Sequence, residues 1–397
     1  MSGTTELSDS VKKFQAFKSG LRVRNKIYGL SGTAELSDSV KEFQAFKSGL
    51  RVRNKIYGLS GTAELSDSVK EFQAFKSGLR ADIRYFGPKF SFSHLWPQTF
   101  DALGETWSTV EQFYQCTKAI LGQDSVAAKA IKNEPDGKSQ KRLSHSIHNM
   151  HPEYWLIVRY YVMLRADYEK YNQCIRLREI LLSTGTRRII EDNRKDSYWG
   201  GKNNAAGSIL MMLRSYFSGN KVVLPSTLVI GAYSSGELTL KDVNGQLVVC
   251  LSFPTAKIDY LMQVAKYITG PYVRRLVLIG GVRNFFNQSR KAKLGSSEML
   301  RKTLTFAREF NQLYPSTQLY LCTLLHNSPM FGTRVSRHIE RYNNSLRSLT
   351  PGLPSNVAIF DFGFDFLAEE IFENEFHLSA HGFRHVLDVF FTKMPCL

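Results

Sequence analysis

The feature that most constrains the fold is a change of hydrophobic periodicity near residues 218–221. Before this point apolar residues recur at three- and four-residue spacing, which predicts helices over residues 110–120, 154–171, 174–182 and 206–217. After it, β-branched runs predict strands over residues 226–230, 275–279, 318–322 and 357–360, alternating with helical stretches such as 297–313 and 380–391. The sequence therefore predicts a multidomain chain, with a mostly helical domain over residues 84–219 and an α/β domain with a parallel sheet over residues 222–397.

Residues 1–83 consist of near-identical 29-residue repeats. Residues 31–59 repeat residues 2–30 with only two changes, and a third copy follows as far as Arg80. In the second copy Ser39 and Glu42 form a capping box and Gly49 ends the helical pattern, so each copy predicts one short helix. We interpret the segment as a recent duplication of short helices or poorly ordered chain. A binding role would lie in the basic, aromatic stretches 22–30 and 51–59.

The chain carries 52 Lys and Arg against 35 Asp and Glu, and its formal net charge is +17. The excess is spread evenly, with +5 over residues 1–83, +6 over 84–219 and +6 over 220–397. An evenly basic chain favours polyanionic ligands and leaves nucleic acid open as a partner, although it is equally compatible with solubility alone.

Five cysteines are scattered without a CxxC pair, which indicates a reducing compartment and argues against structural zinc. No apolar run reaches the length of a signal peptide or a membrane span. We expect an intracellular, soluble protein with no membrane partner. The sequence does not distinguish cytoplasm from nucleus, and it leaves the oligomeric state open.

Acidic and aromatic residues gather beside turn residues in the helical domain. Glu111 follows Trp107 by four residues, so its carboxylate is expected in the first turn of a helix, where the dipole favours the charge. Further along, Asp196, Trp199 and Gly200 lead into a helix near Gly207. Such a group suits a flat base, a ribose and a phosphate. The alternatives are core packing for the tryptophans and a helix-cap role for Glu111.

Two blocks of this domain resemble the NADAR, or YbiA-like, family over roughly residues 84–217. The first block, residues 92–118, matches a W-x-T-x-E-x-x-x-Q-x-x-K pattern through Trp107, Thr109, Glu111, Gln115 and Lys118, preceded by Phe92 and Ser93. The second block, residues 181–214, matches through Leu181, Leu182, Thr184, Asp196, Trp199, Gly200, Asn204, Gly207, Leu210 and Met211. Trp155 and Met163 match on the helix between the blocks.

The resemblance implies an N-glycosidase that cleaves the bond between ribose C1′ and a base, in ADP-ribosylated guanine or in a ribosylated pyrimidine of riboflavin synthesis. It implies Glu111 as the catalytic carboxylate, with Asp196 second, placing water or ribose hydroxyls. Trp155 and Trp199 would stack on or wall the substrate. The remaining implied contacts to phosphate or ribose come from Lys118, Lys202, Asn204, Gly200 and His94. No cofactor is implied.

Three departures from the family pattern support a different function. His94 stands for an Asn, Gln112 stands for a His after the glutamate, and the loop between Gly200 and Gly207 is short. These changes favour an inactive reader of ADP-ribose or nucleotides, and the basic charge favours a nucleic-acid-associated scaffold. The retained carboxylates favour an active glycosidase.

In the carboxy-terminal domain a first strand, LVIG at residues 228–231, ends in a turn, a later strand reads LVLIGG at residues 276–281, and residues 376–391 read FHLSAHGFRHVLDVFF. With these segments the domain faintly resembles SGNH/GDSL hydrolases. Tyr233 stands where the family has its nucleophile, with Ser234 one place late, and Asn374 stands for the Asp that precedes His377. Without an anionic partner the imidazole of His377 has no group to orient it. We expect an inactive, degenerate hydrolase domain. His377, His381 and His385 share one helical spacing but lack an acidic ligand, so we expect no metal site.

Overall fold

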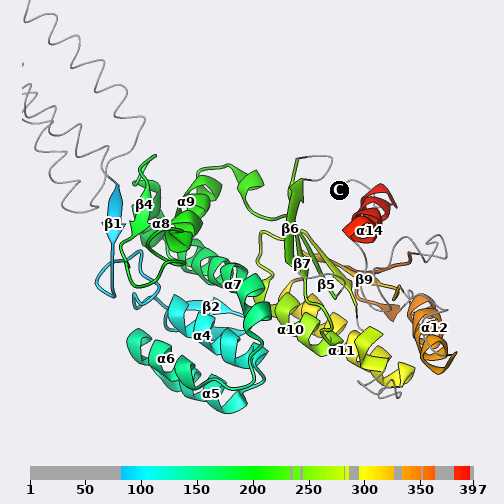
Figure 1. Cartoon of the computed structure of the whole chain (residues 1–397). Helices are drawn as coiled ribbons and strands as arrows, with labels where there is room; N and C mark the ends of the chain where they lie inside the picture. The colour runs from blue at the N-terminus through cyan, green and yellow to red at the C-terminus, as the bar shows by residue number, and fades with distance from the viewer. Residues whose placement is uncertain are drawn as a thin grey trace, which may run out of the picture. The chain divides into compact units, whose positions relative to one another are not determined.

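The computed structural model of the chain describes residues 82–232, 236–241, 245–280, 282–285, 295–325, 333–349, 352–362 and 380–393 (Figure 1). Apart from Asp82 and Ile83, the repeats predicted over residues 1–83 lie outside the described residues. So do Tyr233, Ser234, Asn374 and His377. The described chain divides into two compact units. The first holds residues 82–93 with Tyr171–Gly219, and the second holds His94–Lys170 with the residues from Asn220 onward. The domain boundaries at 84–219 and 222–397 stay a prediction.

The first unit is a small two-stranded sheet covered by helices. Its elements are β1 (Ile83–Tyr85), the end of α7 (Pro152–Gln173), α8 (Ile175–Leu182), β4 (Ile189–Glu191) and α9 (Ala205–Phe217). Strands β1 and β4 are parallel, with Ile83 opposite Ile189. Helix α9 lies so close to β4 that a Cβ atom on Gly207 would be 2.0 Å from the carbonyl oxygen of Ile189. Glycine is therefore required at this contact.

The second unit begins with a hairpin and four helices, of which α7 continues into the first unit. Its elements are β2 (Phe100–Ala102), β3 (Glu105–Trp107), α4 (Val110–Leu121), α5 (Ser125–Asn133), α6 (Gly137–Leu143), the 3-10 turn η1 (Ser144–Ser146) and α7. The side chains of Thr109, Asp124 and Asp136 each accept a hydrogen bond from a backbone N–H in the first turn of α4, α5 and α6. These N-caps fix where the helices begin. Helices α4, α7, α8 and α9 confirm the four predicted helical segments.

The rest of the second unit is built on a six-stranded sheet in the order β10-β9-β8-β5-β7-β6. The strands are β5 (Thr227–Gly231), β6 (Gly236–Lys241), β7 (Leu247–Ser252), β8 (Arg275–Ile279), β9 (Gln318–Cys322) and β10 (Val357–Phe360). Five strands are parallel, and β6 pairs antiparallel with β7 at one edge. The predicted parallel sheet is thereby confirmed.

Helices cover both faces of this sheet, as Figure 1 shows. They are α10 (Ile258–Ile268), α11 (Ser296–Leu313), α12 (Thr333–Ser348) and α14 (Ala380–Lys393), with the 3-10 turns η2 (Lys221–Val223) and η3 (Val282–Phe285). Apolar residues of α14 join one core with the sheet residues, whereas α10 contacts β5 and β8 and α11 packs on α12. Because both faces are covered, the central strand β5 is buried along its whole length.

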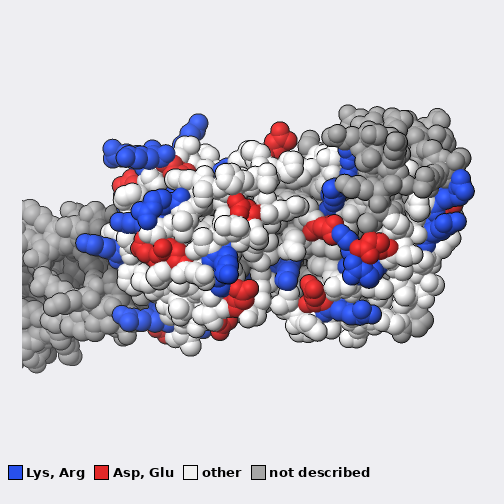
Figure 2. Space-filling view, turned by 90° about the horizontal axis from the view of Figure 1, so that it is seen from below, with Lys and Arg blue, Asp and Glu red and all other residues white. Residues whose placement is uncertain are grey.

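The surface charge of the described residues is mixed. On the face drawn in Figure 2, Lys and Arg side chains are interspersed with Asp and Glu and do not merge into one basic stripe. The described helices include none long and apolar enough to cross a membrane.

Candidate active site

Glu111 lies in the first turn of α4, as the sequence predicts, and its side chain is buried with only 6% exposed. Its backbone N–H donates to the carbonyl oxygen of His94 at 3.1 Å. Gln115 donates from Nε2 to Glu111 Oε1 at 2.8 Å. This hydrogen bond fixes the position of the carboxyl group in the first turn of α4, where a helix favours acidic side chains. The structure thus holds one carboxylate in a fixed orientation at a buried helix end.

Lys118 stands seven residues after Glu111, so it lies on the same face of α4. Burial lowers the pKa of Lys118, and the charge of Glu111 opposes part of that shift. The Oε1 atom of Gln115 is buried and accepts no hydrogen bond from the described residues. One face of α4 therefore carries, in order, the carboxyl group of Glu111, the side-chain amide of Gln115 and the amine of Lys118.

His94 is buried, and its Nε2 lies 2.9 Å from Asp167 Oδ2. Asp167 comes from the middle of α7 and has no exposed surface. Because the carbonyl of His94 accepts from Glu111, this pair connects α7 to the start of α4. Nε2 of His94 is therefore engaged by Asp167. The predicted contact of His94 with the substrate stays a prediction and would involve other atoms of the residue.

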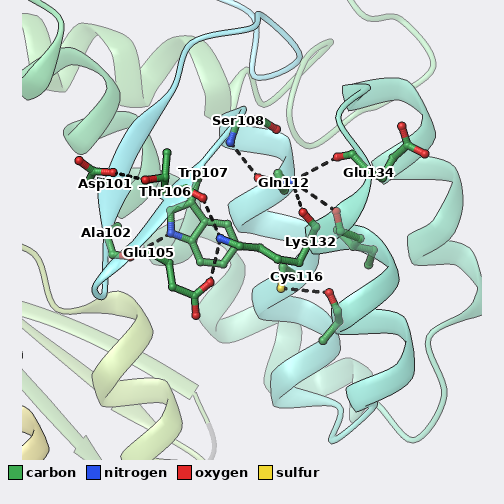
Figure 3. Close-up of polar contacts among 12 residues, drawn as sticks. Asp101, Ala102, Glu105, Thr106, Trp107, Ser108, Gln112, Cys116, Lys132 and Glu134 are labelled. Atoms are coloured by element: carbon green, nitrogen blue, oxygen red, sulfur yellow. Dashed lines mark hydrogen bonds and ion pairs between the residues drawn. The ribbon is translucent and has the colours of Figure 1, made fainter.

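Gln112 has a structural task in the described fold. Its Nε2 donates to the carbonyl oxygens of Lys132 at 2.8 Å and Glu134 at 3.2 Å, at the end of α5 (Figure 3). Its Oε1 accepts from the backbone N–H of Ser108 at 2.8 Å. Beside it Trp107 is held by a bond from Nε1 to Ala102 and by Lys132 Nζ, 3.3 Å from its ring centroid. Gln112, which stands where the family pattern has a His, therefore caps the end of α5 and makes no hydrogen bond to the carboxylate of Glu111.

The three tryptophans singled out from the sequence differ in their surroundings. Trp155 of α7 is buried against Tyr114 of α4, with ring centroids 4.9 Å apart. Trp107 is buried against Phe113 at 5.0 Å. This is the core packing that the sequence left open for the tryptophans. Trp199 is half-buried in the other unit and touches Tyr198, with centroids 4.9 Å apart.

Asp196 organises a turn in the first unit. Its Oδ1 accepts from the backbone N–H groups of Tyr198 at 3.1 Å and Trp199 at 3.0 Å, and its carbonyl accepts from Gly200. A Cβ atom on Gly200 would lie 2.7 Å from the carbonyl oxygen of Glu191, so the turn requires glycine there. The predicted polar turn is confirmed, and it holds Asp196 half-buried.

Asn204 joins this turn to α9. Its Nδ2 donates to Ile189 at 2.8 Å and its Oδ1 accepts from the N–H of Glu191 at 3.0 Å. The N–H groups of Ala205 and Ala206 donate to carbonyls of the turn. Asn204 thus ties α9 to β4, whereas Lys202 is exposed. Their contacts with phosphate or ribose stay predictions.

The sequence analysis did not identify Asp167 as part of the site, and it did not predict the hydrogen bond from Gln115 to Glu111. Asp167 stands three or four residues from the buried Met163, Leu164 and Tyr171, and a carboxylate on such a helix face is the signal that could have found it. In the described residues no three His, Cys, Asp or Glu side chains lie close enough to hold a metal ion. The described cysteines are free, and burial raises the pKa of Cys116 and Cys250 to about 12.

Comparison with known proteins gives a consistent result for the segment from β1 to α9. The family model of the NADAR domain matches residues 84–218. The N-glycosidase YbiA of Escherichia coli is 31% identical over 130 residues, which cover 32% of this chain and 78% of that protein. An N-glycosidase of Nostoc punctiforme is 28% identical over 120 residues, covering 30% and 77%. A riboflavin biosynthesis protein of Vibrio vulnificus is 29% identical over 127 residues, covering 31% and 34%.

Proposed function

This chain belongs to the NADAR domain family, and on that premise we propose that it is an N-glycosidase that hydrolyses the bond between ribose C1′ and the nitrogen of a base. The observation that carries the proposal is the buried Glu111 carboxylate, held by Gln115 and followed by Lys118 on one face of α4. Two of the relatives above are named N-glycosidases. The resemblance to an SGNH/GDSL hydrolase in the carboxy-terminal region stays a prediction.

The chemistry asks for groups of this kind. As the C1′–N bond breaks, its electron pair leaves with the base and positive charge develops on the ribose. Water adds its oxygen to C1′, and its proton goes to the departing nitrogen or to solvent. A fixed carboxylate stabilises the developing cation and orients the water. We assign this role to Glu111, whose carboxyl group is held in place by the hydrogen bond from Gln115.

The other proposed roles concern substrate binding. Lys118 supplies a positive charge for a phosphate or a ribose hydroxyl, and Lys202 supplies a second one on the turn of the first unit. Asp196 places a ribose hydroxyl or water, and Trp199 offers a half-exposed ring on which a base can stack. The substrates proposed are ADP-ribosylated guanine and a ribosylaminopyrimidine. The second class is supported by the relative named for riboflavin biosynthesis.

The test is base release from ADP-ribosylated guanosine, from ADP-ribosylated DNA and from the ribosylaminopyrimidine, followed by mass spectrometry. Glu111→Gln keeps the shape but removes the negative charge, and we expect it to lower kcat by about 10²–10⁴-fold. Glu179→Gln, at an exposed position of α8, is the matched control and should leave the rate unchanged. A Glu111→Gln protein as active as its parent would remove this assignment. Tight binding without release would favour the nucleotide-reader alternative.

For the carboxy-terminal region we propose that no ester hydrolysis occurs. The support lies in the sequence, where Tyr233 replaces the nucleophile and Asn374 replaces the acid that would orient His377. The full chain should turn over p-nitrophenyl acetate no faster than background. Turnover that disappears in Ser234→Ala and in His377→Ala would make this region an active esterase.

A further inference from the structure

The second unit from Asn220 onward, which we call the α/β part, packs against α4, the helix that carries Glu111. Tyr267 of α10 lies 6.0 Å from Phe113 of α4, measured between ring centroids, and both side chains are buried. Phe113 is two residues from Glu111 and two from Gln115, so it lies on the opposite side of α4. Helix α10 therefore supports α4 from behind the face that presents the carboxylate.

A second contact involves a buried charge on α7. Arg165 is 3% exposed, and its guanidinium pairs with Glu169 one turn further along the helix. It also lies 5.9 Å from the centroid of the ring of Tyr314, which follows α11. Burial opposes the charge of Arg165, but Tyr314, Glu169 and Tyr272 together outweigh it, so its pKa is raised. The cation is thus held jointly by α7 and the α/β part.

Neighbouring aromatic contacts extend this interface along α7. The ring of Tyr168 lies 4.9 Å from that of Tyr272. Near the start of α7, Tyr154 packs on Phe253 at 5.5 Å and on Tyr260 at 5.2 Å. Its hydroxyl donates to the carbonyl of Pro254. The α/β part therefore contacts α7 near its start, at Tyr154, and again about four turns further along, at Tyr168.

The opposite side of α7 leads to the proposed site. Asp167 stands two residues from both Arg165 and Glu169, so it points away from that pair and meets His94. The carbonyl of His94 accepts the N–H of Glu111. Helices α4 and α7 each carry a site residue on one side and an aromatic or charged contact with the α/β part on the other.

We propose that the α/β part is a positioning element of the glycosidase, which fixes Glu111 by holding α4 through Tyr267 and α7 through Tyr314, Tyr272 and the Pro254 carbonyl. This inference rests on the proposed function for its kinetic consequence, although its structural consequence is independent of any activity. Tyr267, Tyr272 and Tyr314 are positioning residues, since they act through α4 and α7. Small displacements of a catalytic group cost rate more than they cost binding.

The test compares two tyrosines of the full chain. Tyr314→Phe removes the hydroxyl that donates to the carbonyl of Lys266 at 2.6 Å and that interacts electrostatically with Arg165. Tyr342→Phe is the matched control, because its hydroxyl is also buried and bonds to Thr303 at 3.1 Å within the α/β part. We expect Tyr314→Phe to lower kcat by about 10- to 100-fold with KM changed less than about two-fold. Tyr342→Phe should leave both constants unchanged.

Amide hydrogen exchange of peptides from α4 and α7 supplies a readout that needs no substrate. It should quicken in Tyr314→Phe and stay unchanged in Tyr342→Phe. Tyr154→Phe, which loses the hydrogen bonds of its hydroxyl to Pro254 and Thr255, repeats the comparison if Tyr314→Phe does not fold. Equal effects of the control and test variants, or unchanged exchange and kcat in Tyr314→Phe and Tyr154→Phe, would overturn the proposal. If the parent releases no base while exchange responds as expected, the proposed function fails and the positioning role stands.

Discussion

The charge of Lys118 is the residue-scale property that links the face of α4 to pH. Burial lowers the pKa of Lys118, so the ammonium loses its proton at a lower pH than an exposed lysine, whose pKa is about 10.4. The charged form, which prevails below this lowered pKa, is the one that would bind phosphate. We therefore predict that kcat/KM falls as pH rises through the lowered pKa of Lys118. Lys118→Arg keeps its charge at every accessible pH and should move this alkaline limb upward.

The measurement is a profile of kcat/KM against pH for the parent and the variant. Lys129→Arg serves as the control, because Lys129 is exposed on α5 and outside the proposed site. An alkaline limb that stays in place in Lys118→Arg would assign the titration to another group.

At the scale of elements, the junction of α9 with β4 sets the position of the Asp196 turn. A Cβ atom on Gly207 would lie 2.0 Å from the Ile189 carbonyl and 2.4 Å from Nδ2 of Asn204, the donor that binds that carbonyl. Gly207→Ala must therefore push α9 away from β4. We predict that it lowers the free energy of unfolding by about 2–3 kcal/mol, which urea denaturation would measure. Gly352→Ala, where a Cβ atom would meet nothing within 4 Å, should change it by less than about 1 kcal/mol. A Gly207→Ala protein as stable as its parent would show that α9 can move without cost.

At the scale of the whole molecule, the first described strand, β1, makes its contacts with other described residues of the fold. Strand β1 pairs with β4, and Arg84 lies 3.6 Å from Asp192 in an ion pair. We therefore predict that deleting residues 2–59, the two complete repeats, leaves thermal unfolding cooperative and the midpoint within about 2 °C. Calorimetry of the deletion and of the full chain gives the comparison. Loss of a single cooperative transition would make the repeats part of the folded core.

Some elements could be predicted from the sequence and others could not. Helices α4, α8 and α9 and strands β8, β9 and β10 fall within about two residues of their predicted bounds, because apolar spacing and capping residues are local signals. The hairpin of β2 and β3 was not predicted. In its turn Leu103 has a φ of 60°. Because Asn, Asp and Gly usually occupy this conformation, a leucine there gives no sequence signal for a hairpin. Strands β1 and β4 are three residues each, and their pairing joins segments far apart in the sequence.

The sequence by itself determined the position of Glu111 in a first helical turn, the Asp196 turn before α9 and the parallel sheet. Each of these depends on residues within a few positions of one another or on a repeating apolar pattern. The tertiary structure alone decided that Asp167 meets His94, that Gln112 caps α5 and that Arg165 meets Tyr314. The partners in these contacts come from different elements, and burial makes each polar group depend on the partner that packing brings to it.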